Sequence, residues 1–143
     1  MINDYENIKF EGNNLHVIGT SYNYGGTYNN SSNITRKLIL ENTTTYKRYT
    51  YNIGSTNKGS YKVTSTDNKS KEYAWYDKLI DISDLDKGTY SMIVYTKTSD
   101  SEDYGEINDL FGMAPSISTT INNKNYRIYL NKNKLNVIEL IVE

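Results

Sequence analysis

"DISDLDKGTYSMIVYT", residues 81–96, places three aspartates before a glycine and continues as an apolar, tyrosine-bearing segment. Asp81, Asp84 and Asp86 could serve as hard oxygen ligands, as in calcium loops, or as caps of backbone N–H groups in a turn. An EF-hand loop would need a ligand where Leu85 stands and a glutamate at its twelfth position, and neither is present. The pattern therefore favours a chain corner, and calcium at Asp84 and Asp86 stays the alternative.

The spacing of the apolar residues in this stretch indicates what kind of corner it is. Leu85, Gly88 and Tyr90 follow the pattern L-x-x-G-x-Y. In immunoglobulin-type sandwiches, a tyrosine near the start of a late strand hydrogen-bonds back to the backbone a few residues upstream. A leucine that fills the core and a glycine that turns the chain suit the same crossing. We therefore predict a structural corner at Leu85, Gly88 and Tyr90.

Alternating apolar and polar residues dominate the rest of the chain, and turn-forming Asn, Gly and Ser clusters separate the segments. This pattern predicts an all-β fold, an immunoglobulin-like antiparallel β-sandwich of about nine strands. At most one short helix is expected, near 104–111, because Ile107, Leu110 and Phe111 have helical spacing within 102–112. The expected strands lie at 8–10, 15–20, 34–41, 46–53, 61–66, 73–82, 89–98, 117–121, 126–130 and 135–142.

Length and charge narrow the class of protein. The 143 residues predict a single domain, 1–143, which we interpret as a module excised from a larger exported protein. The formal net charge of −1 argues against a nucleic-acid partner. No apolar run is long enough for a membrane span, and the N-terminus has no signal-peptide pattern. Whether Met1 is native stays open.

The sequence offers few residues for catalysis or cofactor binding. Cysteine is absent and His16 is the single histidine, so we expect no metal site, no cofactor and no catalytic residue. His16 lies within an alternating segment and is expected at the edge of the core or in solvent. A glycosidase-type carboxylate pair, with Asp77, Asp103 and Glu106 as candidates, is the enzymatic alternative.

Tyrosine and asparagine are abundant, with 15 Tyr and 19 Asn, and this composition also results from a genome rich in A and T. Tyrosine rings and amide groups are equally what sugar binding favours. The polar loop 21–33 is long for a compact domain, which makes it a candidate ligand loop. Trp75 is more simply a core residue between the sheets. The candidate ligand-binding residues are Tyr22, Tyr24, Tyr28, Tyr73, Trp75 and Tyr76.

The segments 34–54, 74–90 and 103–112, together with the closing LNVIELIVE, resemble a module of clostridial and related Gram-positive cell-wall hydrolases and surface proteins. In such proteins the module lies beside a catalytic domain, often a glucosaminidase-type peptidoglycan hydrolase, and is itself non-catalytic. The shared motifs concern packing and turns. The resemblance therefore implies a fold and a setting, and no catalytic residue.

From this we expect a non-catalytic accessory module of a secreted Gram-positive cell-wall protein, giving weak wall or glycan attachment or spacing for a peptidoglycan hydrolase. Its expected partners are cell-wall glycan or peptidoglycan and the adjacent catalytic domain of the parent chain. Two alternatives stay open: a purely structural spacer or protein–protein contact, and a small stand-alone carbohydrate-active enzyme.

Overall fold

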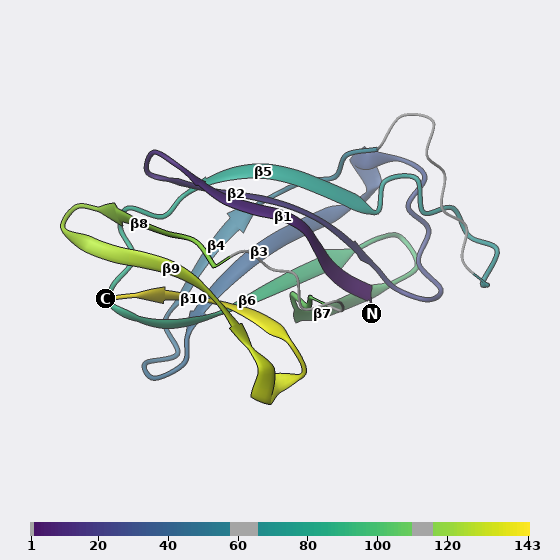
Figure 1. Cartoon of the computed structure of the whole chain (residues 1–143). Helices are drawn as coiled ribbons and strands as arrows, with labels where there is room; N and C mark the ends of the chain where they lie inside the picture. The colour runs from purple at the N-terminus through teal and green to yellow at the C-terminus, as the bar shows by residue number, and fades with distance from the viewer. Residues whose placement is uncertain (1, 58–65, 110–115) are drawn as a thin grey trace.

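The computed structural model describes residues 2–57, 66–109 and 116–143. Within these ranges the chain is all-β, with ten antiparallel strands in two sheets and no α-helix (Figure 1). The smaller sheet has the order β1-β2-β5, and the larger one has the order β4-β3-β6-β10-β9-β8, with β7 paired to β6. The larger sheet curls, so the architecture is a sandwich with one side shaped like a half-barrel. The strands are β1 (Ile2–Glu11), β2 (Asn14–Tyr22), β3 (Thr35–Asn42), β4 (Arg48–Asn52), β5 (Trp75–Asp81), β6 (Gly88–Lys97), β7 (Glu102–Glu106), β8 (Ser118–Ile121), β9 (Lys124–Asn131) and β10 (Val137–Val142).

The strand order agrees with the immunoglobulin-like arrangement that the sequence predicts. Strands β1, β2 and β5 take the places of strands A, B and E, and β3, β6 and β10 take those of C, F and G. In the sequence, the additional strands β7, β8 and β9 lie between β6 and β10, although β6 and β10 are direct neighbours in the sheet. Apolar side chains from both sheets form one core between the layers, among them Leu15, Val17, Leu38, Leu40, Ile80, Met92, Val94, Ile138 and Leu140.

Most predicted strands are present. The short helix predicted near 104–111 is wrong within the described residues, because residues 102–106 form the strand β7. The cause is an edge of β6 that β10 leaves unpaired. Strand β10 pairs with β6 only as far as Ser91, so the backbone N–H and C=O groups of the rest of β6 need another partner. Strand β7 supplies it along Ile93–Lys97, and Ile107 then packs into the core. Residues 61–65 of the strand predicted at 61–66, and residues 110–111 of the predicted helix, lie outside the described residues.

Leu85, Gly88 and Tyr90 lie where the chain turns from β5 into β6. The Tyr90 hydroxyl donates a hydrogen bond to the backbone oxygen of Asp86 at 2.7 Å, and the Leu85 and Tyr90 side chains are buried. Asp81 acts as the predicted turn cap, since its carboxylate accepts from the backbone N–H of Ser83 at 2.9 Å. The Asp86 carboxylate has a different contact, an ion pair with Lys47 at 3.1 Å.

One buried arginine ties the two sheets together. Arg36, on β3 of the larger sheet, is only 2% exposed. Its guanidinium donates to the backbone oxygen of Ser21 at 2.9 Å, at the end of β2 in the smaller sheet, and to that of Trp75 at 3.3 Å, at the start of β5. A further bond goes to the oxygen of Gly54 at 3.0 Å. Burial lowers the pKa of Arg36 to about 10, which leaves the side chain charged at neutral pH.

No helix in the described ranges is long and apolar enough to cross a membrane.

The corner generates a stability prediction. Gly88 has φ +150°, and a Cβ built there would lie 2.4 Å from Nδ2 of Asn42. The Asn42 side chain cannot give way easily, because its Oδ1 accepts from the N–H groups of Thr44 and Thr45. We expect Gly88→Ala to lower the free energy of unfolding by more than about 2 kcal/mol in urea denaturation.

Gly12→Ala is the matched control, because Gly12 has φ +60° in the β1–β2 turn but open space around it. It should cost only about 1 kcal/mol, the price of the backbone strain alone. Equal losses in the two variants would show that the contact with Asn42 does not constrain the corner.

Candidate functional site

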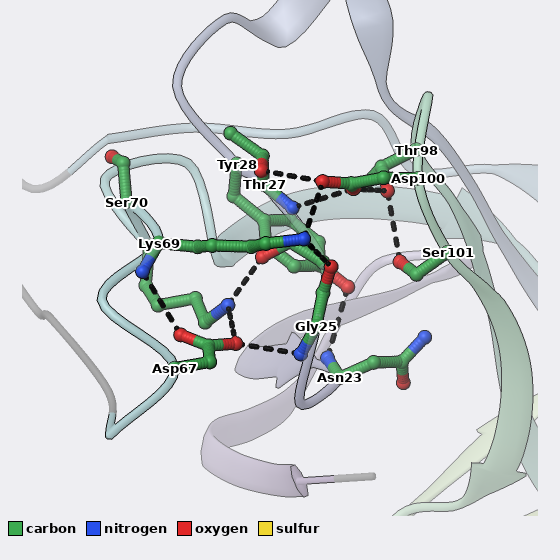
Figure 2. Close-up of polar contacts among 12 residues, drawn as sticks. Asn23, Gly25, Thr27, Tyr28, Asp67, Lys69, Ser70, Thr98, Asp100 and Ser101 are labelled. Carbon is green, nitrogen blue, oxygen red and sulfur yellow. Dashed lines mark hydrogen bonds and ion pairs between the residues drawn. The ribbon is translucent and has the colours of Figure 1, made fainter.

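Three segments that are far apart in the sequence meet at one end of the sandwich, and we call them the loop cluster: residues 23–28, 67–71 and 98–101 (Figure 2). Backbone hydrogen bonds join the first two. The N–H of Tyr28 donates to the oxygen of Ser70 at 2.8 Å, and the N–H of Tyr73 donates to the oxygen of Tyr28 at 2.8 Å. The candidate ligand loop of the sequence is therefore paired with a second segment like a short strand.

Tyr28 lies at the centre of this cluster. Its ring is fully buried, with its edge towards Tyr22 at 6.5 Å between centroids, and its hydroxyl accepts from the N–H of Asn23 at 2.9 Å. Burial raises the pKa of Tyr28, so the phenol stays neutral. Gly26 is required beside it, because a Cβ there would lie 2.8 Å from the Tyr28 ring.

A buried ion pair supports the loop from below. Lys71 is 0% exposed, and its ammonium lies 3.0 Å from the Asp67 carboxylate. The same ammonium donates to the backbone oxygen of Gly26 and lies 5.3 Å from the centre of the Tyr28 ring. The Asp67 carboxylate in turn accepts from the N–H of Gly25 at 2.6 Å. Because both charges are desolvated, the pair holds the loop in one conformation more than it adds net stability.

Asp100 holds the other side of the loop. Its carboxylate accepts from the Thr27 hydroxyl at 2.7 Å, from the Thr27 N–H at 2.8 Å and from the Lys69 ammonium at 3.0 Å. Thr98 adds a fourth donor at 2.9 Å. These hydrogen bonds hold the pKa of Asp100 well below its usual range, and the bond from the Thr27 hydroxyl has the largest effect. The Asp100 carboxylate is therefore ionised at any physiological pH.

The six predicted ligand-binding residues divide into two groups. Tyr28, Trp75 and Tyr76 are buried, which removes them as a stacking surface because no ring face is open to solvent. Tyr22 and Tyr73 are half-buried, and Tyr24 is 76% exposed. Asn29 and Asn30, further along the same loop, are also exposed. Ligand binding at Tyr22, Tyr24 and Tyr73 stays a prediction.

The residues that shape the loop cluster were not identified from the sequence. Asp67, Lys69, Lys71 and Asp100 lie in polar, turn-rich segments where charged residues are ordinarily solvated. The burial of Lys71 depends on contacts with residue 26 and with Tyr28, which are more than forty positions away. No local spacing encodes such a contact.

His16 belongs to a separate cluster on the outer face of the smaller sheet. Its Nε2 lies 2.5 Å from an Asp77 oxygen and its Nδ1 lies 3.2 Å from a Glu11 oxygen, while Lys9 also pairs with Glu11 at 3.0 Å. The hydrogen bond to Asp77, assisted by Glu11, raises the pKa of His16 above its usual 6.5.

The other candidate carboxylates do not join this cluster. Asp103 and Glu106 lie on β7 in the larger sheet, where they line a hollow of about 550 Å³, whereas Asp77 lies on β5. Among the described residues, no group of three or more His, Asp and Glu side chains is arranged to hold a metal ion.

Comparisons with known proteins place the fold. Neither a scan against protein-family models nor a search of curated protein sequences gave a match. Among solved structures, the all-β domain is similar to part of Staphylococcus aureus TarS, with a TM-score of 0.57 and 14% identity. The match covers 98% of this chain and 24% of the TarS chain, so this chain spans about a quarter of that protein's length. At this identity the likeness shows the fold alone, and the predicted family stays a prediction.

The buried ion pair predicts a large effect for a single substitution. Lys71→Met keeps the volume but leaves the Asp67 carboxylate without its cation, and we expect a loss of about 3–5 kcal/mol in urea denaturation. Lys69→Met is the matched control. Lys69 is partly exposed and pairs with Asp100, so its loss should cost less than about 1 kcal/mol. Similar losses for the two lysines would contradict a structural role for the buried pair.

The His16 cluster predicts a dependence of stability on pH. Because the folded-state pKa of His16 is raised, its contribution is complete below pH 6.5 and is lost as the pH rises through the folded-state pKa. The stability difference between the wild type and His16→Gln should therefore shrink as the pH rises, by less than about 1 kcal/mol because the two carboxylates are partly exposed. A difference that is constant from about pH 5 to pH 9 would show that the cluster does not stabilise protonated His16.

Proposed function

We propose that this domain is a non-catalytic accessory module of a secreted Gram-positive cell-wall protein, and that it attaches weakly to wall glycan through the loop cluster. The observation that carries the proposal is the combination of a rigid loop and an open ring. Tyr24 is 76% exposed on a loop whose neighbours Gly25, Thr27 and Tyr28 are all held by buried or charge-assisted hydrogen bonds.

A loop held in this way suits weak ligand binding for a physical reason. Binding to a mobile loop loses free energy in ordering it, and a loop ordered in advance avoids most of that cost. A tyrosine ring offers a flat apolar face to a sugar ring, and the exposed amide of Asn29 can both donate to and accept from hydroxyl and acetamido groups. The Asn30 amide can donate as well, while its oxygen accepts from Ser32. The network of Asp67, Lys71 and Asp100 then has the role of support.

The setting rests on two observations. The sequence resembles modules of Gram-positive cell-wall hydrolases, and the fold is similar to part of TarS from Staphylococcus aureus, a Gram-positive species. A structural spacer is the second candidate, favoured by the burial of Tyr28, Trp75 and Tyr76, which leaves less aromatic surface than the sequence predicts. Release of reducing ends from peptidoglycan by the isolated domain would instead favour the third candidate, a carbohydrate-active enzyme.

Retention on purified Gram-positive cell-wall sacculi tests the proposal. We expect the wild-type domain to be retained and Tyr24→Asn to be retained at least about fivefold more weakly, because the stacking face is lost. Unlike Tyr28, Tyr24 contributes little to the core, so the variant should keep its melting temperature.

Tyr46→Asn is the matched control, since Tyr46 is 72% exposed in the turn between β3 and β4. Its backbone has φ 62°, a conformation that asparagine tolerates well. The control should be retained like the wild type. If the wild-type domain passes through the sacculi without retention, wall attachment is wrong and the spacer function is favoured.

A further inference from the structure

Tyr104 lies on the larger sheet between two hollows, whose linings share no residue with the loop cluster. It lies on β7, is 70% exposed, and is the one residue that lines both hollows. The first hollow has a volume of about 230 Å³ and lies over the outer face of β3, β6 and β7. The second, of about 550 Å³, lies between β7 and the turn before β10. An exposed aromatic ring with a recess on either side is the geometry of a stacking surface with two neighbouring subsites.

The first hollow has an apolar floor and a cation at its rim. Ile39 and Ile93 are direct cross-strand partners and are half-buried on the outer face, and Tyr95 is likewise paired directly with Tyr104. The Tyr95 hydroxyl donates to Glu102 at 2.8 Å, which fixes the orientation of that ring. The recess is smaller than the ~300–1,000 Å³ of pockets for drug-sized ligands, so its size suits one ring of a longer chain.

Arg48 supplies the charge of the first hollow. Its Nε donates to Glu41 at 2.7 Å, and its two terminal nitrogens have no partner among the described residues. The contact with Glu41 holds the guanidinium in place, while the free N–H groups remain available to a carboxylate or a phosphate.

The second hollow is rich in acceptors. Asp103 and Glu106 line it together with Asn3 and Asn108, and its cation, Lys134, lies 3.6 Å from the Glu139 carboxylate. The Nδ2 of Asn3 donates to the backbone oxygen of Gly105, whereas its buried Oδ1 has no hydrogen-bond partner in the described part of the chain. Carboxylate and amide oxygens at such a density match a ligand that presents several hydroxyl or amide donors. Leu135, which is almost completely exposed, adds an apolar contact at the rim.

We propose that Tyr104 and its two hollows form a second saccharide site, which binds an oligosaccharide that carries an acidic group. One sugar ring lies in the second hollow and donates its hydroxyl groups to Asp103 and Glu106. The chain passes over the face of Tyr104, and the next ring rests on Ile39 and Ile93 with its carboxylate or phosphate at Arg48. This site deepens the proposed wall attachment, on which it rests, by giving the domain a second contact on a different face and a preference for acidic glycans.

Amide chemical shifts of the ¹⁵N-labelled full chain test the site with two tetrasaccharides of equal length. Hyaluronan tetrasaccharide carries a carboxylate on every second ring, and chitotetraose is neutral. Both should shift the amides of Ile93, Tyr104 and Glu106. The acidic probe should bind about threefold to fivefold more tightly, the effect of one solvent-exposed ion pair.

Three variants separate the parts of the proposal. Tyr104→Asn should weaken both probes at least about fivefold. Arg48→Gln should remove the preference for the acidic probe and leave chitotetraose binding unchanged. Tyr46→Asn should leave all of these shifts as in the wild type, because its exposed ring lines neither hollow.

The two proposals fail in different ways. Shifts at Tyr104 without retention on sacculi would uphold this site and overturn wall attachment. Retention that depends on Tyr24, with no shift at Tyr104 for either probe at millimolar concentration, would overturn the second site alone. Concentration-dependent broadening of the Ile93 and Tyr104 signals without any saccharide would mean that this face binds a second copy of the chain, which also overturns it.

Discussion

The packing of the two sheets against each other depends on one buried positive charge, that of Arg36. Arg36 extends from the larger sheet and donates to backbone oxygens at the end of β2 and the start of β5 in the smaller sheet. A desolvated guanidinium is costly unless its N–H groups find acceptors, and several carbonyl groups converge on it here. Sliding either sheet would take these acceptors away from the buried charge. Arg36 therefore fixes the position of one sheet relative to the other. The loop cluster lies directly beside it, since the centre of the Tyr28 ring is 5.9 Å from the guanidinium carbon.

The loop cluster shows how a polar loop becomes part of a rigid scaffold. Tyr28 fills its interior, Lys71 and Asp67 neutralise each other below it, and Asp100 collects donors at its edge. Buried polar networks of this kind contribute specificity when every member is satisfied. The outcome is a segment that has the composition of a mobile loop and the hydrogen bonding of a strand. Tyr24 is left as the aromatic ring at its surface, which is why glycan attachment is proposed there.

The strand β7 has an equivalent role at the other candidate surface. Because β10 pairs with only the first part of β6, the later part offers free backbone groups, and β7 completes the ladder. This placement brings Tyr104 directly opposite Tyr95, and Glu106 directly opposite Ile93, on the outer face of the sheet. The two proposed sites thus arise from different structural causes, one from a buried ion pair and one from strand pairing. They share no lining residue and use different aromatic residues.

The sequence by itself determined the all-β class, most of the strands and the corner at Leu85, Gly88 and Tyr90. These features depend on alternation along a strand or on contacts within a few residues, so they are legible in the order of the residues. The helix expected within 102–112 failed because three apolar residues at helical spacing are a weaker constraint than an unpaired stretch of β6. The candidate ligand residues could be placed on segments, but the buried ones could not be separated from the exposed ones. Tyr24 and Tyr28 lie in the same loop, and only Tyr28 is buried. Only the tertiary structure decided which tyrosines face solvent, where Arg36 and Lys71 are buried, and that Tyr104 stands between two hollows. The contacts that bury Lys71 against Gly26 and Tyr28, and Arg36 against Trp75, join residues about forty positions apart, and no local pattern carries that information.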